Sequence, residues 1–304
     1  MKLFARSTDT RELSLHAHAS AGSVARARIV VFTLCAVEAL LLLAQASDVP
    51  NGAFHAFGFL TLLPPDALDW VRSSNGSGII LWSAVIASAA AAAGLMPRIS
   101  MPLATALLIV TQLIPRGVLG FVNHAQVPVM LCAVVLCLGP SADALTLWPR
   151  KRVTTDPRAY QATLILMPMF ICLGYLFIAA HRVSYGGWEL FSSDSLSQWL
   201  VRWNLGADDP ETSLGFMIVR NPTLAAMLKA SFPLTTLLEL SAPLVLLYPR
   251  YRLFFIPAML SVHLGIYFLM HINFWELALL FVVFIDSRHW SPSVRPPQLP
   301  LALG

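Results

Sequence analysis

Ionisable and amide side chains recur inside stretches of this sequence that are otherwise apolar. A charged group at the centre of a bilayer costs about 2.5–3.5 kcal/mol on insertion scales, so such groups ordinarily face the interior of a helix bundle or a watery cavity. There they can donate and accept protons. The residues of this kind are Glu38, Asn123, His124, Gln126, Glu239, His263 and Glu276, with His181, Arg182 and His271 near the ends of apolar runs.

Acid–base chemistry is the reaction type that this set of residues could support. The candidate acids and bases are His124, His181, Glu239 and Glu276. The candidate substrate-binding residues are Asn123, Arg182, Trp188, His263 and Glu38. Each of them has an alternative explanation, because carboxylates, histidines and amides also hold helices together by hydrogen bonding. No HxxE, HxxH or HxH spacing occurs among them, so the sequence predicts no metal site.

The composition places these residues in a membrane protein. Of the 304 residues, 57% are hydrophobic and only 12% are charged, whereas a soluble domain carries about 25% charged residues. Apolar runs of membrane-spanning length recur, which predicts an all-α, polytopic helical membrane bundle. Basic cytoplasmic loops explain the net charge of +4 without a nucleic-acid partner. The four cysteines lie in apolar segments without a CxxC motif and are predicted to be packing residues.

About eight transmembrane helices follow from the apolar windows. Their predicted ranges are 28–46, 79–96, 99–115, 117–139, 160–180, 231–248, 252–271 and 273–286. Pro115-Arg116-Gly117 predicts a tight turn between the third and the fourth. His271-Ile272-Asn273 indicates a turn or a kink before the last, short one.

The basic residues predict that both termini are cytoplasmic. With the N-terminus inside, 14 of the 20 Lys and Arg residues fall on the inner side, as the positive-inside rule requires. In this orientation His124 lies roughly 10 Å below the outer end of its span, at about 1.5 Å per residue. The carboxylates lie no deeper than mid-membrane, so we expect a cavity that opens to the outer side.

Three segments make up the predicted domain organisation. Residues 1–27 form a cytoplasmic tail, residues 28–290 the transmembrane domain, and residues 291–304 a disordered tail with four prolines. The outer loops are 47–78 and 181–230, and the second, with Trp188, Trp199 and Trp203, is expected to form short interfacial helices. The sequence "AQA" after the first apolar run resembles a signal-peptide cleavage site, but Glu38 interrupts that run and favours an uncleaved first span.

Three stretches resemble the vitamin K-dependent gamma-carboxylase-like family, also called HTTM, the horizontally transferred transmembrane domain. "FVNHAQVPVMLCAVVLCLGPSADALTLWP" resembles the family's Asn-His helix and the acidic loop after it. "YLFIAAHRVSYGGWELFSSDSL" is similar to the helix that ends in basic residues before a tryptophan motif. "HLGIYFLMHINFWELALLFVVFID" resembles the late pair of His-containing helices. The resemblance covers about residues 25–290.

This resemblance implies a site on the outer side and reduced quinone as the cofactor class. In the family's carboxylases a lysine shortly before the motif tryptophan deprotonates vitamin K hydroquinone. Trp188 matches that tryptophan, but His181 and Arg182 stand where the lysine is expected. Arginine stays protonated in proteins and cannot be the base, whereas histidine can. The glycine after the tryptophan and the large lumenal domain are also missing, so glutamate carboxylation is not expected.

Three functions are compatible with these features. The first is an oxidoreductase-like or peptide-maturation enzyme that uses a quinone or another lipid-soluble substrate, with a secreted peptide as a second substrate. The second is a small proton or solute transporter, although no inverted repeat is visible. The third is an accessory subunit whose polar residues only pack helices. The expected location is a bacterial plasma membrane, with membrane lipids as the surroundings.

Overall fold

Every regular element in the computed structural model is a helix within residues 19–44, 56, 58–119, 126–148, 156–192, 194–205 and 212–284, the part of the chain that the structure describes. The first half contains α1 (Ala21–Leu43), η2 (Gly58–Leu62), α2 (Pro65–Arg72), α3 (Ser74–Ala93), α4 (Pro97–Leu119), α5 (Val127–Leu138) and α6 (Pro157–Gly186). The second half contains α7 (Glu189–Ser192), α8 (Ser195–Asn204), α9 (Leu214–Arg220), α10 (Pro222–Leu240), α11 (Leu244–Leu247), η4 (Pro249–Tyr251), α12 (Arg252–Met270), α13 (Trp275–Leu280) and η5 (Phe281–Phe284).

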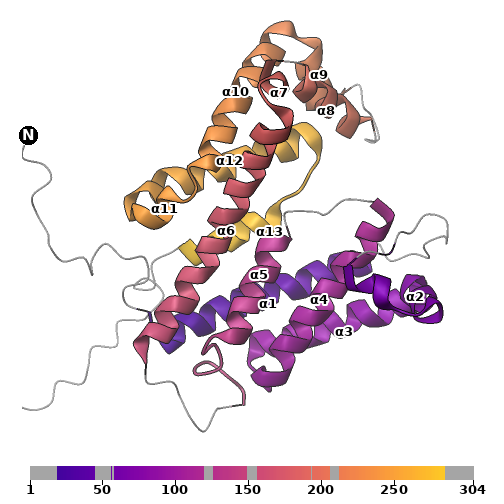
Figure 1. The fold of residues 1–304 in the computed structure, drawn as a ribbon, viewed down its shortest axis with the longest axis vertical. Helices are drawn as coiled ribbons and strands as arrows, with labels where there is room; N and C mark the ends of the chain where they lie inside the picture. The colour runs from indigo at the N-terminus through magenta and orange to yellow at the C-terminus, as the bar shows by residue number, and fades with distance from the viewer. Residues whose placement is uncertain are drawn as a thin grey trace, which may run out of the picture.

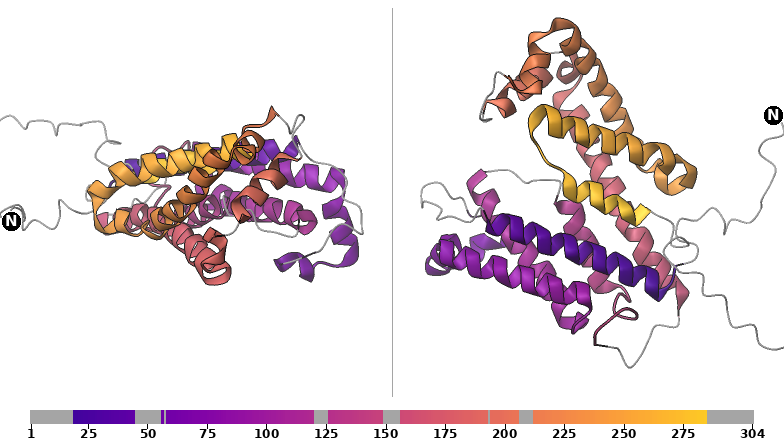
Figure 2. Two further views of the ribbon diagram at one scale, coloured as in Figure 1. Left: turned by 90° about the horizontal axis from the view of Figure 1, so that it is seen from above. Right: turned by 180° about the vertical axis from the view of Figure 1, so that it is seen from behind.

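The helices form two groups that α6 connects (Figure 1). The lower group contains α1 to α5, in which α1 packs against α3, α4 and α5. The upper group contains α7 to α12, with α10 packed along α6. The chain then returns, and α13 lies against α1 and α5 of the lower group (Figure 2). α13 therefore completes a group of packed helices that begins with α1.

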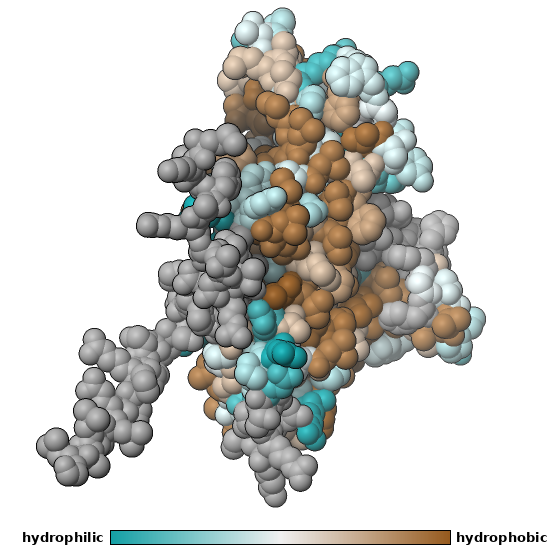
Figure 3. Space-filling model, turned by 60° about the vertical axis from the view of Figure 1, so that its left-hand side comes forward, coloured by the Kyte–Doolittle hydropathy of each residue, from teal (hydrophilic) through white to brown (hydrophobic). Residues whose placement is uncertain are grey.

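Four helices are long and apolar enough to cross a membrane: Ser74–Ala93, Pro97–Ile114, Pro157–Gly186 and Arg252–Met270. These helices leave large apolar side chains exposed, among them Ile86, Phe177 and Leu253. In Figure 3 apolar residues cover much of the visible face, and hydrophilic residues gather toward its ends. Such a surface is stable next to lipid chains but not next to water. The all-helical architecture and the membrane character expected from the sequence are both present.

Local side-chain chemistry explains where several helices begin and end. Ser20, Ser73, Asp156 and Asn221 precede α1, α3, α6 and α10, and each accepts a hydrogen bond from a backbone N–H of the first turn. Such caps satisfy donors that have no partner inside the helix. Gly94 ends α3 at φ +70°, and a Cβ there would lie 2.8 Å from Thr146 Cα. Both its conformation and its close approach to the 139–148 loop therefore require glycine.

Three predicted helix boundaries are wrong. α4 continues through Pro115-Arg116-Gly117 to Leu119, so no turn lies there; proline removes one backbone donor, but its fixed φ permits a helix. The expected span 231–248 is interrupted after Leu240, three residues before Pro243, because the position before a proline disfavours the helical conformation. α1 begins at Ala21, inside the tail predicted for residues 1–27.

The other predicted boundaries agree more closely. The spans 79–96, 160–180 and 252–271 correspond to α3, α6 and α12. His271 takes φ +56° and ends α12, so the break before α13 is a turn. The stretch 181–230 contains the short helices α7, α8 and α9, as expected. Residues 1–18 and 285–304, which include the predicted C-terminal tail, lie outside the described residues.

Candidate functional site

Two glutamates from opposite ends of the chain meet in the lower group of helices. Glu38 lies near the end of α1, and Glu276 lies in the first turn of α13. Both side chains line the same small cavity, and both residues are more than nine-tenths buried. The packing of α13 against α1 is what brings them together. The predicted acid Glu276 and the predicted binding residue Glu38 therefore belong to one site.

Two glutamine amides complete this site, which we call the carboxyl centre (Glu38, Gln112, Gln126 and Glu276). Gln112 on α4 donates from Nε2 to Glu38 Oε1 over 3.3 Å. Gln126, just before α5, donates to the same oxygen. The four side chains line a cavity of about 10 Å³ whose other walls are apolar, near the minimum that holds one water molecule. Polar side chains from α1, α4, α13 and the residue before α5 thus line one small cavity.

Arg182 and Glu239 form a second site, in the upper group. Arg182 Nη1 donates to Glu239 Oε2 over 2.6 Å and Nη2 donates to Oε1 over 3.3 Å. Nη1 also reaches Thr236 Oγ1 at 2.9 Å, and the guanidinium lies 5.2 Å from the ring centre of Phe232. A two-pronged contact of this kind is the strongest geometry for such a pair. Glu239, a predicted acid–base residue, is therefore paired with an arginine.

Tyr175 and His263 form a hydrogen-bonded pair close to this site. Tyr175 Oη lies 2.7 Å from His263 Nε2. The tyrosine ring stacks on Phe281 at an interplanar angle of 7°, and the histidine ring lies 5.0 Å from Phe274. Tyr175 and Arg182 are seven residues apart on α6 and therefore share a helix face. Arg182 in turn contacts Glu239. The upper group thus contains an acid, a base and a phenol near one another.

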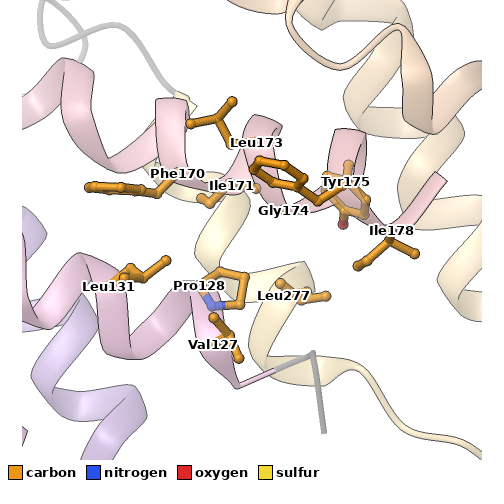
Figure 4. Close-up of a pocket in the computed structure, with 11 residues that line it drawn as sticks. Val127, Pro128, Leu131, Phe170, Ile171, Leu173, Gly174, Tyr175, Ile178 and Leu277 are labelled. Atoms are coloured by element: carbon orange, nitrogen blue, oxygen red, sulfur yellow. The ribbon is translucent and has the colours of Figure 1, made fainter. Parts of the chain in front are cut away.

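An apolar groove lies between α5 and α6 (Figure 4). Its volume is about 400 Å³, within the usual range for a small-molecule site. Val127, Pro128 and Leu131 form one wall, α6 residues from Phe170 to Ile178 form the other, and Leu277 of α13 lies at one end. Tyr175 is the one lining residue whose side chain is polar. A molecule that fits this groove must be largely apolar.

The groove borders the carboxyl centre. Val127 follows Gln126 and Leu277 follows Glu276, and both Val127 and Leu277 line the groove. At its α6 side the groove reaches Tyr175, whose hydroxyl is bonded to His263. An apolar molecule in the groove would therefore lie between two groups of proton donors and acceptors.

The remaining predicted site residues lie elsewhere. His181 is exposed, with its ring 4.3 Å from that of Tyr185. Trp188 is 76% exposed and follows Gly187, which takes φ +53°. Asn123 and His124 lie outside the described residues, although their segment leads directly into Gln126. No group of three or more potential metal ligands occurs among the residues that the structure describes.

Sequence reasoning missed Gln112 and Tyr175 as site residues. Gln112 interrupts the apolar run "LLIVTQLI" and Tyr175 interrupts "ICLGYLFIAA". An amide or phenol in such a run is itself a signal, because a buried polar group needs a hydrogen-bond partner. The identity of that partner depends on which helices are neighbours, which periodicity does not give.

Comparison of the chain with protein-family models, with curated proteins and with solved structures gives no match. The polar centres and the groove must therefore be interpreted from their own geometry.

Proposed function

We propose that this chain is a multi-pass membrane protein that binds a lipid-soluble molecule of the quinone class in the groove between α5 and α6. The observation that carries this proposal is the groove itself, which is about 400 Å³ in volume and apolar except for Tyr175. A quinone combines an apolar tail with a small ring that carries oxygens. Its tail would contact the groove's aliphatic walls, and its ring oxygens would accept hydrogen bonds from the phenol or from Glu276.

The family resemblance favours a quinone over other lipids. We include in the proposal an HTTM-like arrangement of eight spans with both termini in the cytoplasm of a bacterial cell. The reaction class that suits these residues is proton exchange at the bound ring, as in an oxidoreductase-like enzyme. Glutamate carboxylation stays outside the proposal, because Arg182 stands near the expected lysine position and is bonded to Glu239.

Gly174 offers a direct test of the groove. It lines the groove, and a Cβ added there meets nothing within 4 Å. Gly174→Leu would therefore fill the groove without a clash and would raise helix propensity by about 1 kcal/mol. Gly265→Leu is the matched control, because Gly265 is also a half-buried helical glycine with open space around its Cβ and does not line the groove.

Native mass spectrometry with lipid extraction would compare the purified wild type with the two variants. We expect a discrete lipid-soluble molecule on the wild type and on Gly265→Leu, and its loss from Gly174→Leu. Chemical analysis of the extract identifies its class. If all three proteins carry only bulk phospholipid, the groove is an ordinary lipid-facing surface and the quinone proposal fails.

An accessory role is the second candidate function. The observation in its favour is that Arg182 occupies both carboxylate oxygens of Glu239, which is what a pair that only packs helices requires. A partner subunit that copurifies with the Gly174→Leu variant as well as with the wild type would favour this role.

A further inference from the structure

The carboxyl centre places two buried carboxyl groups on one cavity of about 10 Å³, Glu38 and Glu276. Two ionised carboxylates that share an apolar site repel each other strongly, so one of the two holds a proton in the stable state. A carboxylate has only acceptors, whereas a protonated carboxyl group can also donate.

The glutamine amides determine which of the two carries the proton. Gln112 and Gln126 both donate to Glu38 Oε1, and amide donors stabilise the ionised form of the carboxyl that they contact. Glu38 Oε1 thus accepts two amide hydrogen bonds, whereas neither amide donates to Glu276. The second oxygen of Glu276, Oε2, has no hydrogen-bond partner among the described residues.

No cation compensates this pair within the described part of the chain. The other residues that line the cavity are uncharged: Leu34 of α1, Leu108 and Gln112 of α4, Gln126 before α5, and Val129 of α5. The other titratable group near Glu38 is the thiol of Cys35. Glu239, which is buried to the same degree, differs because Arg182 neutralises it.

We propose that the carboxyl centre is a proton-binding site, in which Glu276 binds and releases one proton while Glu38 keeps a negative charge. The free oxygen of Glu276 and the water-sized cavity beside it provide the route for exchange. Release leaves both groups ionised, and uptake returns the proton to Glu276, so no other reactant is needed. This site would exist whether or not the groove holds a quinone.

Infrared spectroscopy of the purified protein at neutral pH tests the proposal. A protonated carboxyl has a C=O stretching band that ionised carboxylates and amides lack. We expect this band in the wild type, its loss in Glu276→Gln, and its retention in Glu239→Gln, the matched control for a buried but ion-paired glutamate. A wild-type spectrum without the band, or a band that survives in Glu276→Gln, would overturn the proposal.

Two further measurements keep the test decisive. The Glu276→Gln amide can still donate to Glu38, so this variant should fold; if it does not, Glu38→Gln replaces it. In Glu38→Gln the band should disappear at a lower pH than in the wild type, because the neighbouring negative charge that favours the protonated form is gone; a band with the same pH dependence as the wild type would overturn the proposal. Adding sodium to sodium-free buffer should leave the wild-type band unchanged. If sodium abolishes the band, the site binds that cation instead, and the proposal of a proton site is wrong.

Discussion

Arg182 shows at the scale of one residue how a charge is kept inside an apolar bundle. Its guanidinium contacts both oxygens of Glu239, the hydroxyl of Thr236 and the face of the Phe232 ring. The positive charge of Arg182 is therefore matched by the negative charge of Glu239, and the guanidinium also contacts a hydroxyl and an aromatic ring. Removal of either charge alone leaves the other one desolvated and unmatched, which costs more than the intact pair contributes.

The Arg182–Glu239 pair gives a prediction about stability. Arg182→Met should destabilise the protein by about 3–5 kcal/mol, because Glu239 is left without its counter-charge. The double variant Arg182→Met/Glu239→Leu should recover most of this loss, because no charge stays buried. Unfolding of the variants in detergent, analysed as a double-mutant cycle, measures the coupling.

Lys229→Met is the control for this prediction. Lys229 lies 3.5 Å from Asp194 in a more exposed pair, and such pairs contribute about 1 kcal/mol or less. Equal effects of Arg182→Met and Lys229→Met would show that the Arg182 pair is not held as the structure describes.

At this scale the sequence predicts which polar residues lie in the bundle interior better than it predicts their hydrogen-bond partners. Glu38, Glu239, His263 and Glu276 stand out because they interrupt apolar runs. The first three have a side-chain hydrogen bond inside the bundle, and Glu276 lines the same cavity as Glu38. Spacing along the sequence does not give the partner of Glu239. Arg182 lies 57 positions before Glu239 in the chain, so only the packing of α6 against α10 determines their contact.

At the scale of elements, one arginine fixes the loop that follows α5. Arg28 on α1 is fully buried and donates to the carbonyl oxygens of Ser141, Ala144 and Leu145. The loop also bonds through Leu147 N to the end of α3. Residues 139–148 are therefore tied to the first and third helices, although they form no helix themselves.

Arg28→Met should loosen this loop. Each carbonyl that loses its donor and stays buried costs about 1–3 kcal/mol, so the segment should open to solvent. We expect hydrogen exchange at residues 139–148 to become faster and thermal stability to fall. Arg98→Met, which removes an exposed arginine from the start of α4, should change neither. Unchanged exchange in Arg28→Met would contradict the role of Arg28.

The approach of α5 to α6 leads to a third prediction. A Cβ at Gly139 would lie 2.4 Å from Thr163 Oγ1 and 2.7 Å from its Cγ2, and a β-branched side chain has little rotamer freedom in a helix. Gly139→Ala should therefore destabilise the protein, and Thr163→Ala should relieve the effect in the double variant. Gly174→Ala, where the space is open, should be neutral or stabilising by about 1 kcal/mol. Thermal unfolding of the four proteins measures these differences.

Long apolar runs predict helices well, but breaks between them are harder to predict. α3, α6 and α12 match their expected ranges within a few residues. Pro115-Arg116-Gly117 has the composition of a turn and yet lies inside α4. Pro243, in contrast, follows a real interruption after Leu240. A proline is present in both places, so it does not by itself predict whether the helix ends there. The packing of neighbouring helices must also contribute.

At the scale of the whole molecule, the apolar surface and the charge distribution determine how the bundle can lie in a membrane. α6 has 30 residues, a length of about 45 Å at 1.5 Å per residue, which is enough to cross a hydrocarbon core about 30 Å thick. Its first turn contains Arg158, and Asp194 follows soon after its end. Most basic residues lie on the side of Arg158 in the predicted orientation.

Cysteine labelling in intact bacterial cells tests this orientation. The four native cysteines lie inside the bundle and are buried, apart from the half-buried Cys137, so they should react slowly with a membrane-impermeant maleimide. Asp194→Cys should be labelled from outside, whereas Arg158→Cys should be labelled only after permeabilisation. The reverse pattern would place the carboxyl centre on the cytoplasmic half of the membrane, so its proton would exchange with the cytoplasm. Labelling of both from one side would show that α6 does not span the bilayer, and the eight-span arrangement would then fail, because every later span is counted from α6.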